Sequence, residues 1–112
     1  MPLPAFIRAM PGLDLPFPED MVTTNAMKTE DGLAVFITAH QELTIPAHSH
    51  GPQWGTVIQG EVTLTIDGQT RTYGPGDTYD IGQGVEHAAT VAAGAVVFDV
   101  FAENDRYPVK LR

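Results

Sequence analysis

Two histidines separated by a single residue are the part of this sequence best suited to chemistry. The segment reads His48-Ser49-His50, and on an extended strand alternate side chains share a face, so both imidazoles point the same way. Two neutral imidazoles directed at one point are good ligands for a borderline divalent metal such as zinc, nickel or iron. Alone, the pair is weak evidence, because two polar surface residues flanking a serine give the same pattern.

The residues after this pair continue a recognisable spacing. Gly51 and Pro52 turn the chain, Gln53 follows, and Gly60 stands after six further residues. This order resembles the first motif of the cupin superfamily, in which His-x-His is followed by a glutamate and then, six residues on, by a glycine.

A second group of glycines leads to a third histidine. Gly76 is followed after five residues by Gly82-Gln83-Gly84, and His87 comes after two more. The second cupin motif has the same spacing, Gly, five residues, Pro-x-Gly, two residues, His. The two motifs cover about half of the chain, and together they favour a metal-ligand role for the three histidines over a surface role.

The resemblance implies an all-β double-stranded β-helix, a jelly-roll-like barrel, that binds one divalent metal ion. The implied ligands are His48, His50, Gln53 and His87, and the ion is zinc, nickel, iron or manganese. Most cupins similar to this chain are homodimers, so we expect a homodimer. Some small cupins with a His, His, Gln, His set act on uronate sugars.

The sequence departs from the family pattern mainly at Gln53, which stands where glutamate is usual. The interval before Gln53 is also short, Gly82 replaces a proline, and Val91 replaces an asparagine. If Gln53 is a ligand, the site keeps both positive charges of the ion, which favours an anionic oxygen donor and an acidic bound water. Alternatively, Gln53 holds a ligating water by a hydrogen bond.

The rest of the chain predicts the strands that would position these residues. Asp67-Gly68 between two alternating runs indicates a tight hairpin, and Gly74-Pro75-Gly76 indicates a loop. Many short strands at close spacing are typical of a sandwich or closed barrel. The predicted strands are Val22–Thr29, Leu33–His40, Glu42–Ala47, Gln53–Gln59, Glu61–Ile66, Gln69–Tyr73, Thr78–Ile81, Glu86–Ala92 and Ala95–Ala102.

Length and composition limit the remaining possibilities. The 112 residues fit one domain, which we divide into an irregular proline-rich arm, 1–20, and a barrel, 21–112. A net charge of −8 argues against nucleic-acid binding. There is no cysteine, hence no thiolate site or disulfide. No apolar stretch suits a signal peptide or membrane span, so we expect a soluble, cytoplasmic protein.

Several other residues have both a structural and a functional interpretation. Aromatic side chains are expected mainly in the core, although Trp54, Tyr79 and Phe98 are also candidates for the wall of a substrate pocket. Asp80 and Asp99 are expected to face outward, although either is a candidate general base. The remaining expectations are surface positions for His40 and Glu86, and either ion pairs or substrate anchoring for Arg71 and Arg106.

Three functions are compatible with these features. The first is a metal-dependent isomerase, lyase or ring-opening enzyme that acts on a small, oxygen-rich anion such as a sugar acid. The second is a non-catalytic small-molecule-binding or sensory barrel. The third is an iron-dependent dioxygenase, which the missing carboxylate ligand disfavours.

Overall fold

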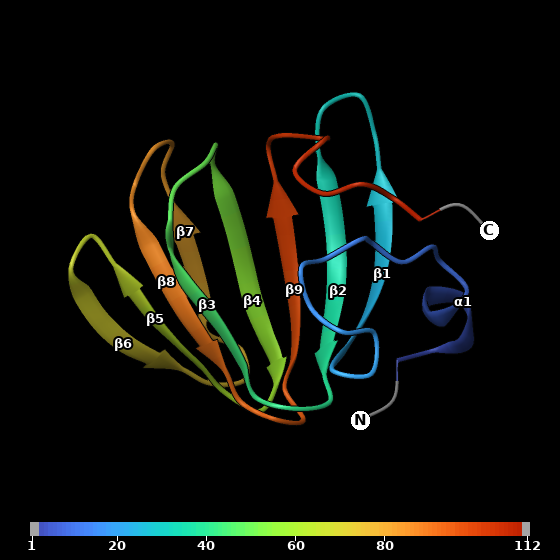
Figure 1. Cartoon of the computed structure of the whole chain (residues 1–112), viewed down its shortest axis with the longest axis horizontal. Helices are drawn as coiled ribbons and strands as arrows, with labels where there is room; N and C mark the ends of the chain where they lie inside the picture. Colours follow the sequence, from blue (N-terminus) through green and yellow to red (C-terminus); the bar gives the residue numbers. More distant parts are fainter. Residues whose placement is uncertain (1–2, 111–112) are drawn as a thin grey trace.

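The chain folds into two antiparallel sheets that face each other (Figure 1). The structure is a computed structural model that describes residues 3–110. Its elements are α1 (Ala5–Arg8), β1 (Val22–Lys28), β2 (Leu33–Ala39), β3 (Leu43–His48), β4 (Gln53–Gln59), β5 (Val62–Ile66), β6 (Gln69–Tyr73), β7 (Thr78–Ile81), β8 (His87–Val91) and β9 (Val96–Phe101). All nine predicted strands are present, and their ends differ from the prediction by at most one residue.

The strand order is that of a jelly-roll barrel and confirms the predicted fold class. One sheet has five strands in the order β1-β2-β9-β4-β7, and the other has four in the order β3-β8-β5-β6. Strands close in sequence, such as β3 and β4, therefore lie in different sheets. As a result, the residues on either side of the turn at Gly51 and Pro52 reach the interior from both layers.

The turn between β5 and β6 has the geometry that its sequence predicts. Asp67 has φ 50° and Gly68 has φ 81°, the positive values that a two-residue hairpin of type I′ requires. Thr63 and Thr65 on β5 bond to threonines on β6 through their hydroxyl groups, at 3.0 and 2.8 Å. These bonds lie on the exposed side and leave Val62 and Leu64 facing inward.

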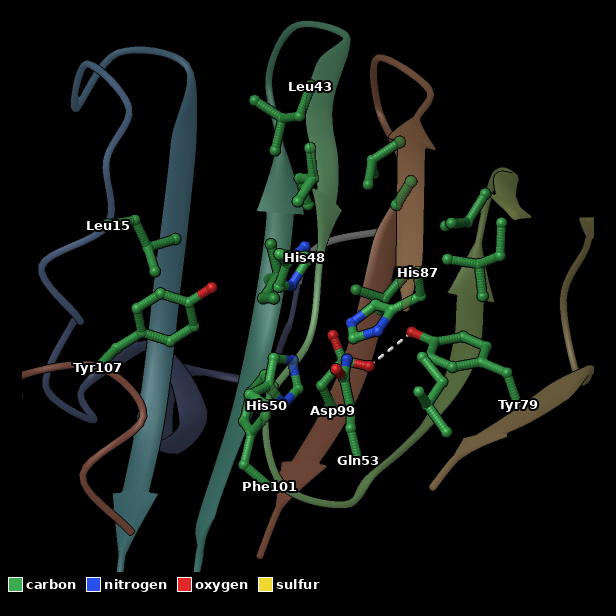
Figure 2. A pocket seen from close by; sticks show the side chains of 18 of the residues that line it. Leu15, Leu43, His48, His50, Gln53, Tyr79, His87, Asp99, Phe101 and Tyr107 are labelled. Carbon is green, nitrogen blue, oxygen red and sulfur yellow. Dashed lines mark hydrogen bonds between the residues drawn. The ribbon is translucent and has the colours of Figure 1, made fainter. Parts of the chain in front are cut away.

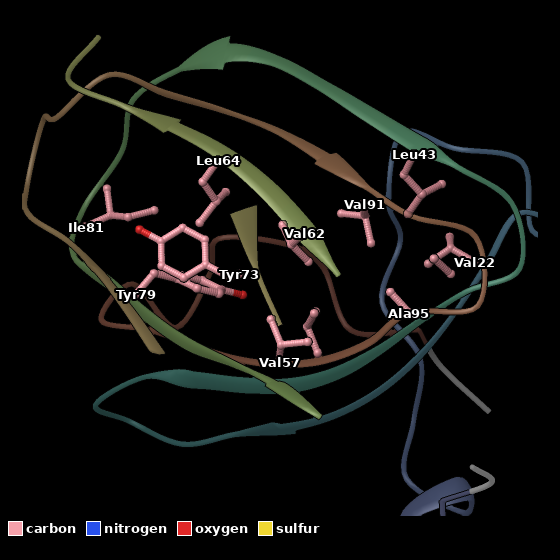
Figure 3. Packing of buried hydrophobic residues seen from close by; sticks show 12 residues of the cluster. Val22, Leu43, Val57, Val62, Leu64, Tyr73, Tyr79, Ile81, Val91 and Ala95 are labelled. Atoms are coloured by element: carbon pink, nitrogen blue, oxygen red, sulfur yellow. The ribbon is translucent and has the colours of Figure 1, made fainter. Parts of the chain in front are cut away.

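Apolar side chains from both sheets meet between the layers and form the core (Figure 3). Val57 and Ile81 from the five-stranded sheet are each 1% exposed, and Leu43 from the other sheet is 2% exposed. Burial of side chains of this size is the main stabilising contribution in a domain of this length. This core extends along the interior as far as Tyr79 and Ile81, beside the polar residues described below.

The proline-rich arm is fastened to the barrel rather than free. The Asn25 side chain donates to the carbonyls of Arg8 and Met10, at 3.2 and 3.1 Å. Leu13 forms a β-bridge with Val109 and is 2% exposed. The arm and the C-terminal segment therefore lie together against β1 and β2. Among residues 3–110, no helix is long and apolar enough to span a membrane.

Candidate metal centre

Three histidines converge at one end of the barrel interior (Figure 2). His48 ends β3, His87 begins β8, and the two are paired in register across the four-stranded sheet. His50 follows in the turn after β3. The ring centroids of His48 and His87 are 4.3 Å apart, and those of His50 and His87 are 4.8 Å apart. One potential ligand atom from each ring lies within 4.8 Å of the other two.

A bulge in β3 aims His48 at this cluster. The pairing of β3 with β8 shifts register between Ile45 and His48, at the position of Pro46. Proline has no N–H to donate to a strand neighbour and is tolerated at bulges. Ile45 and His48 both face the interior as a result, although strict alternation would put them on opposite faces.

Backbone carbonyl groups fix the orientation of all three imidazoles. Nδ1 lies 2.9 Å from the Pro46 carbonyl in His48, 2.7 Å from the Gly51 carbonyl in His50, and 2.9 Å from the Val85 carbonyl in His87. A carbonyl only accepts, so each Nδ1 carries the proton and each Nε2 keeps its lone pair. Such bonds orient histidine ligands in metal proteins, so the three residues fit a divalent ion.

The local environment also favours the neutral, ligating form of these rings. Burial is the main cause that lowers the pKa of His50 and of His87, and hydrogen bonds to Gly51 and Val85 oppose it in part. The positive charge of Arg106 lowers both pKa values further. A ring that resists protonation is available to a metal at neutral pH.

Gln53 lines the same cavity, at the start of β4. It lies beside Asp99, and a hydrogen bond from its side chain favours the ionised form of that carboxyl group. A glutamate at this position would put a second carboxylate against Asp99, whereas an amide can donate to Asp99 and still offer its oxygen to an ion. Asp99 thus supplies a physical reason for glutamine at position 53.

Asp99 is buried and faces the cavity, so the expectation that it faces outward is wrong. Its side chain is in phase with Val97 and Phe101, which are also buried. The Tyr79 hydroxyl donates to Asp99 Oδ1 at 2.5 Å. Burial raises the pKa of Asp99 to about 6, against the opposing effect of the bonds from Tyr79 and Gln53. Burial, followed by the charge of Asp99, raises the pKa of Tyr79.

A glycine makes this contact between Tyr79 and Asp99 possible. Gly55 on β4 lies between them, paired with Tyr79 on one side and with Asp99 on the other. A Cβ at Gly55 would lie 2.1 Å from Asp99 Oδ1 and 2.4 Å from the Tyr79 ring. The missing side chain leaves the space through which Tyr79 reaches across β4.

The cluster opens into a cavity of about 140 Å³ between the two sheets. The three histidines, Gln53, Tyr79 and Asp99 line one part of it, together with Phe101. Leu15 and Phe17 from the arm and Tyr107 from the C-terminal segment complete the wall. The arm therefore belongs to the site, although nothing in its composition pointed to this role.

Two of the three aromatic residues proposed for the pocket lie elsewhere. Tyr79 lines the cavity, but Trp54 and Phe98 do not. Gln53 and Asp99 point inward, so the side chains next to them point outward, as strand geometry requires. Trp54 is 41% exposed, and Phe98 packs against Phe36 with ring centroids 4.5 Å apart.

Four of the remaining candidates lie at the surface, and Arg106 is half-buried. His40 is exposed and bonded to the Thr23 hydroxyl through Nε2, at 2.6 Å. Asp80 and Glu86 are exposed, as expected. Arg71 lies over the Tyr73 ring at 4.6 Å, away from the histidines. Arg106 lies near them and packs on Tyr107 at 4.4 Å.

Comparison with known proteins identifies the family. A family profile described as the cupin domain matches residues 34–101, which include all three histidines. The chain belongs to the cupin family. Comparison of this cupin with curated protein sequences gives no match.

Solved structures similar to this cupin differ widely in size. KdgF from a Halomonas species is 25% identical over 82% of this chain and 88% of its own, with a TM-score of 0.70. An RmlC-like cupin from Shewanella frigidimarina is 21% identical over 80% and 83%, with a TM-score of 0.69. A variant of oxalate decarboxylase from Bacillus subtilis is 19% identical over 79% of this chain and 27% of its own, with a TM-score of 0.67.

Proposed function

We propose that this cupin is a metal-dependent enzyme in which His48, His50, His87 and Gln53 hold one divalent ion, Zn, Ni, Fe or Mn. Its substrate is a small anion that presents carboxylate or enolate oxygens to the ion, the class that includes sugar acids. The observation that carries this proposal is the set of three Nδ1–carbonyl bonds, which leave three Nε2 lone pairs within one small volume. An ion held there would polarise a substrate oxygen as a Lewis acid.

The charges around the site support an anionic substrate. None of the proposed ligands is a carboxylate, so the ligands themselves leave both positive charges of the ion. The nearby carboxylates of Asp99, in the cavity wall, and of Glu103, 3.9 Å from His50 Nδ1, offset these charges in part. Arg106 adds a second positive charge near His50 and His87. Its Nε is buried and has no hydrogen-bond partner within the described residues, although Arg106 does not itself line the cavity.

Asp99 is the proposed general base. Among residues 3–110 it is the only carboxylate that lines the cavity, and the bond from Tyr79 holds one of its oxygens in place. A base next to a polarised carbonyl can remove a proton from the adjacent carbon. This step is common to isomerisation, elimination and ring opening, the reaction types that we propose.

Proton exchange tests this function without requiring the natural substrate. Protein loaded with each of the four metals is incubated in D₂O with a panel of 2-keto acids, 2-hydroxy acids and uronates, and exchange is followed by proton NMR. We expect exchange at the carbon next to the carboxylate or carbonyl group, and we expect chelator or Asp99→Asn to abolish it. Tight anion binding without exchange would indicate a binding module. Oxygen consumption with iron would indicate a dioxygenase.

We also propose that the cupin forms a homodimer and that it is cytoplasmic. The outer face of the five-stranded sheet supports the dimer, because Trp54, Val100, Ala34 and Met27 form one row across β4, β9, β2 and β1. Trp54 and Met27 are each 41% exposed. Exposed apolar groups that adjoin one another on a sheet often mark an interface.

A further inference from the structure

We propose that the substrate combines an oxygen-rich head with an apolar body of about four to six carbons, rather than carrying hydroxyls along its whole length. This inference rests on the proposed function, since the head is the part that faces the metal ligands. It narrows the substrate class and selects against sugar acids. Its basis is the uneven distribution of polar groups along the cavity.

The four-stranded sheet is polar at one end of the cavity only. Neighbouring strands β3, β8 and β5 present their inward side chains in successive rows from the histidine end. The first row contains His48 and His87, and the next two rows are wholly apolar. These rows are Ile45–Ala89–Leu64 and Leu43–Val91–Val62, and all six residues line the cavity.

The five-stranded sheet shows the same division. Gln53, Tyr79 and Asp99 lie in the two rows nearest the histidines, and the row beyond them contains Val97 and Ile37. Both of these also line the cavity. The row of His48 and His87 and the row of Leu43 and Val91 are four residues apart along β8, which is about 14 Å at roughly 3.4 Å per residue. The inner part of the cavity is therefore apolar on both sides.

Several of the polar groups that line the cavity already have partners, while the three Nε2 atoms face the proposed ion and Tyr107 belongs to the C-terminal segment rather than to the apolar rows. Each histidine Nδ1 is bonded to a carbonyl, and the Tyr79 hydroxyl is bonded to Asp99. The hydroxyls of a sugar acid would lose water in the apolar rows without gaining partners there, which is unfavourable. Methylene groups would gain from the same burial.

The size of the cavity suits such a body. An engineered cavity of about 150 Å³ lined by leucine, isoleucine and phenylalanine binds benzene. The cavity of this cupin has about 140 Å³ in all, histidine end included, so its apolar part has room for a hydrocarbon group no larger than that and suits a short chain. Leu15 and Phe17 of the arm add further apolar wall.

Three 2-hydroxy acids with the same chelating head test the inference by calorimetry on zinc-loaded protein. Glycolate is the head alone, 2-hydroxyhexanoate adds a four-carbon chain, and gluconate adds the same chain with four hydroxyls. We expect 2-hydroxyhexanoate to bind at least tenfold more tightly than either of the others. Gluconate binding as tightly as 2-hydroxyhexanoate, or more tightly, would overturn the inference.

Substitution of two alanines on β8 shows where in the cavity the preference for 2-hydroxyhexanoate arises. Ala89 faces the cavity, whereas Ala88 points to the other face of the sheet. Ala89→Leu fills the apolar part and is expected to lose the preference for 2-hydroxyhexanoate, whereas Ala88→Leu is expected to retain it. If both variants retain it, the chain does not bind in the apolar rows and the inference is wrong. If Ala89→Leu does not fold, the three ligands on the wild type decide.

A zinc titration of the wild type comes first and separates the two proposals. If no zinc binds, the proposed function fails and the inference falls with it. If zinc binds but 2-hydroxyhexanoate binds no more tightly than glycolate and gluconate, the proposed function stands and the inference alone is overturned.

Discussion

Glutamine at position 53 is explained by its neighbour Asp99, to which its amide donates a hydrogen bond. Both side chains line the cavity, and the amide favours the charged form of Asp99 through a hydrogen bond. A glutamine can do this while its oxygen remains available to an ion. Gln53, where cupins usually have glutamate, therefore occurs together with an inward-facing aspartate, Asp99. We interpret the two residues as a hydrogen-bonded pair.

Gln53→Glu tests this pairing in the metal-free protein. The variant puts a second carboxylate beside Asp99 and removes the amide donor, and unfavourable contacts of this kind cost about 1–3 kcal/mol. We expect that loss in the free energy of unfolding, measured by urea titration at pH 8 with chelator present. Gln83→Glu, at an exposed loop position, should change it little. Equal stability of the two variants would contradict the pairing.

The buried Asp99 predicts a pH-dependent cost to stability. Its pKa is raised from 3.8 to about 6 in the folded protein, so the folded state binds more protons than the unfolded state between these values. The contribution of Asp99 to stability therefore becomes more favourable as pH falls through this window and is most unfavourable above pH 6. A shift of this size corresponds to about 3 kcal/mol at most.

Asp99→Asn removes this cost and keeps an acceptor for Tyr79. In metal-free protein we expect the variant to unfold with a higher free energy than the wild type at pH 8, and the difference to shrink towards pH 4. Urea titrations at both pH values measure it. A difference that stays the same at both pH values would mean that ionisation of Asp99 is not its cause.

At the scale of the strands, β4 is the element on which the site depends. It carries Gln53 into the cavity, Gly55 under the Tyr79–Asp99 bond, and Trp54 to the outside. At Gly55 no larger residue fits, because Tyr79 and Asp99 occupy the space that a side chain would need.

Gly55→Ala should therefore be costly although alanine is small. Overpacking costs about 1–3 kcal/mol in typical cores, and here the added carbon meets a buried carboxylate as well as a ring. We expect a loss of more than about 2 kcal/mol or no folded protein, measured by thermal and urea unfolding. Gly74→Ala is the control, because no atom lies within 4 Å of its added carbon. Similar stability of the two variants would show that Tyr79 and Asp99 can move to accommodate the added carbon, which would contradict this prediction.

The strands and the histidines were predictable from the sequence, but the direction of some strand residues was not. The spacing around His48, His50 and His87 is specific, and glycines and prolines mark the turns. In Val96–Phe101, however, five of six residues are apolar, so alternation does not reveal which face is inside. Val97 and Phe101 share a face with Asp99, but Val96, Phe98 and Val100 make the other face equally apolar. At Trp54 the large aromatic ring suggested burial, but the polar Gln53 takes the inward position.

The whole molecule has an apolar outer face that the proposed dimer would cover. Trp54 lies on β4, between Asp80 on the edge strand β7 and Val100 on β9. Trp54→Glu places a charge where two copies would meet, and an unpaired charge in an apolar interface opposes association. We expect a dimer for the wild type and a monomer for this variant, from light scattering at micromolar concentration. Thr72→Glu, at an exposed position of β6, should remain dimeric. A monomeric wild type would contradict the proposed dimer.

The arm and the C-terminal segment show that the site is a property of the whole chain. Leu15, Phe17 and Tyr107 come from outside the strands and still line the cavity. The main chain joins the two segments, since Asp14 donates to Pro108 at 2.9 Å and Lys110 donates to Gly12 at 2.8 Å. Changes in either segment are therefore expected to alter ligand binding as well as stability.

Metal content is the most direct test of the account, because every proposed role starts from an ion at the histidine cluster. Purified protein is dialysed at pH 8 against equal traces of zinc, nickel, iron and manganese, the iron under anaerobic conditions, and its metal content is measured by mass spectrometry. We expect one ion per chain in the wild type and in His40→Gln, which lies outside the cluster, and almost none in His48→Gln or His50→Gln. A wild type without metal, or cluster variants that bind as much metal as the wild type, would contradict it.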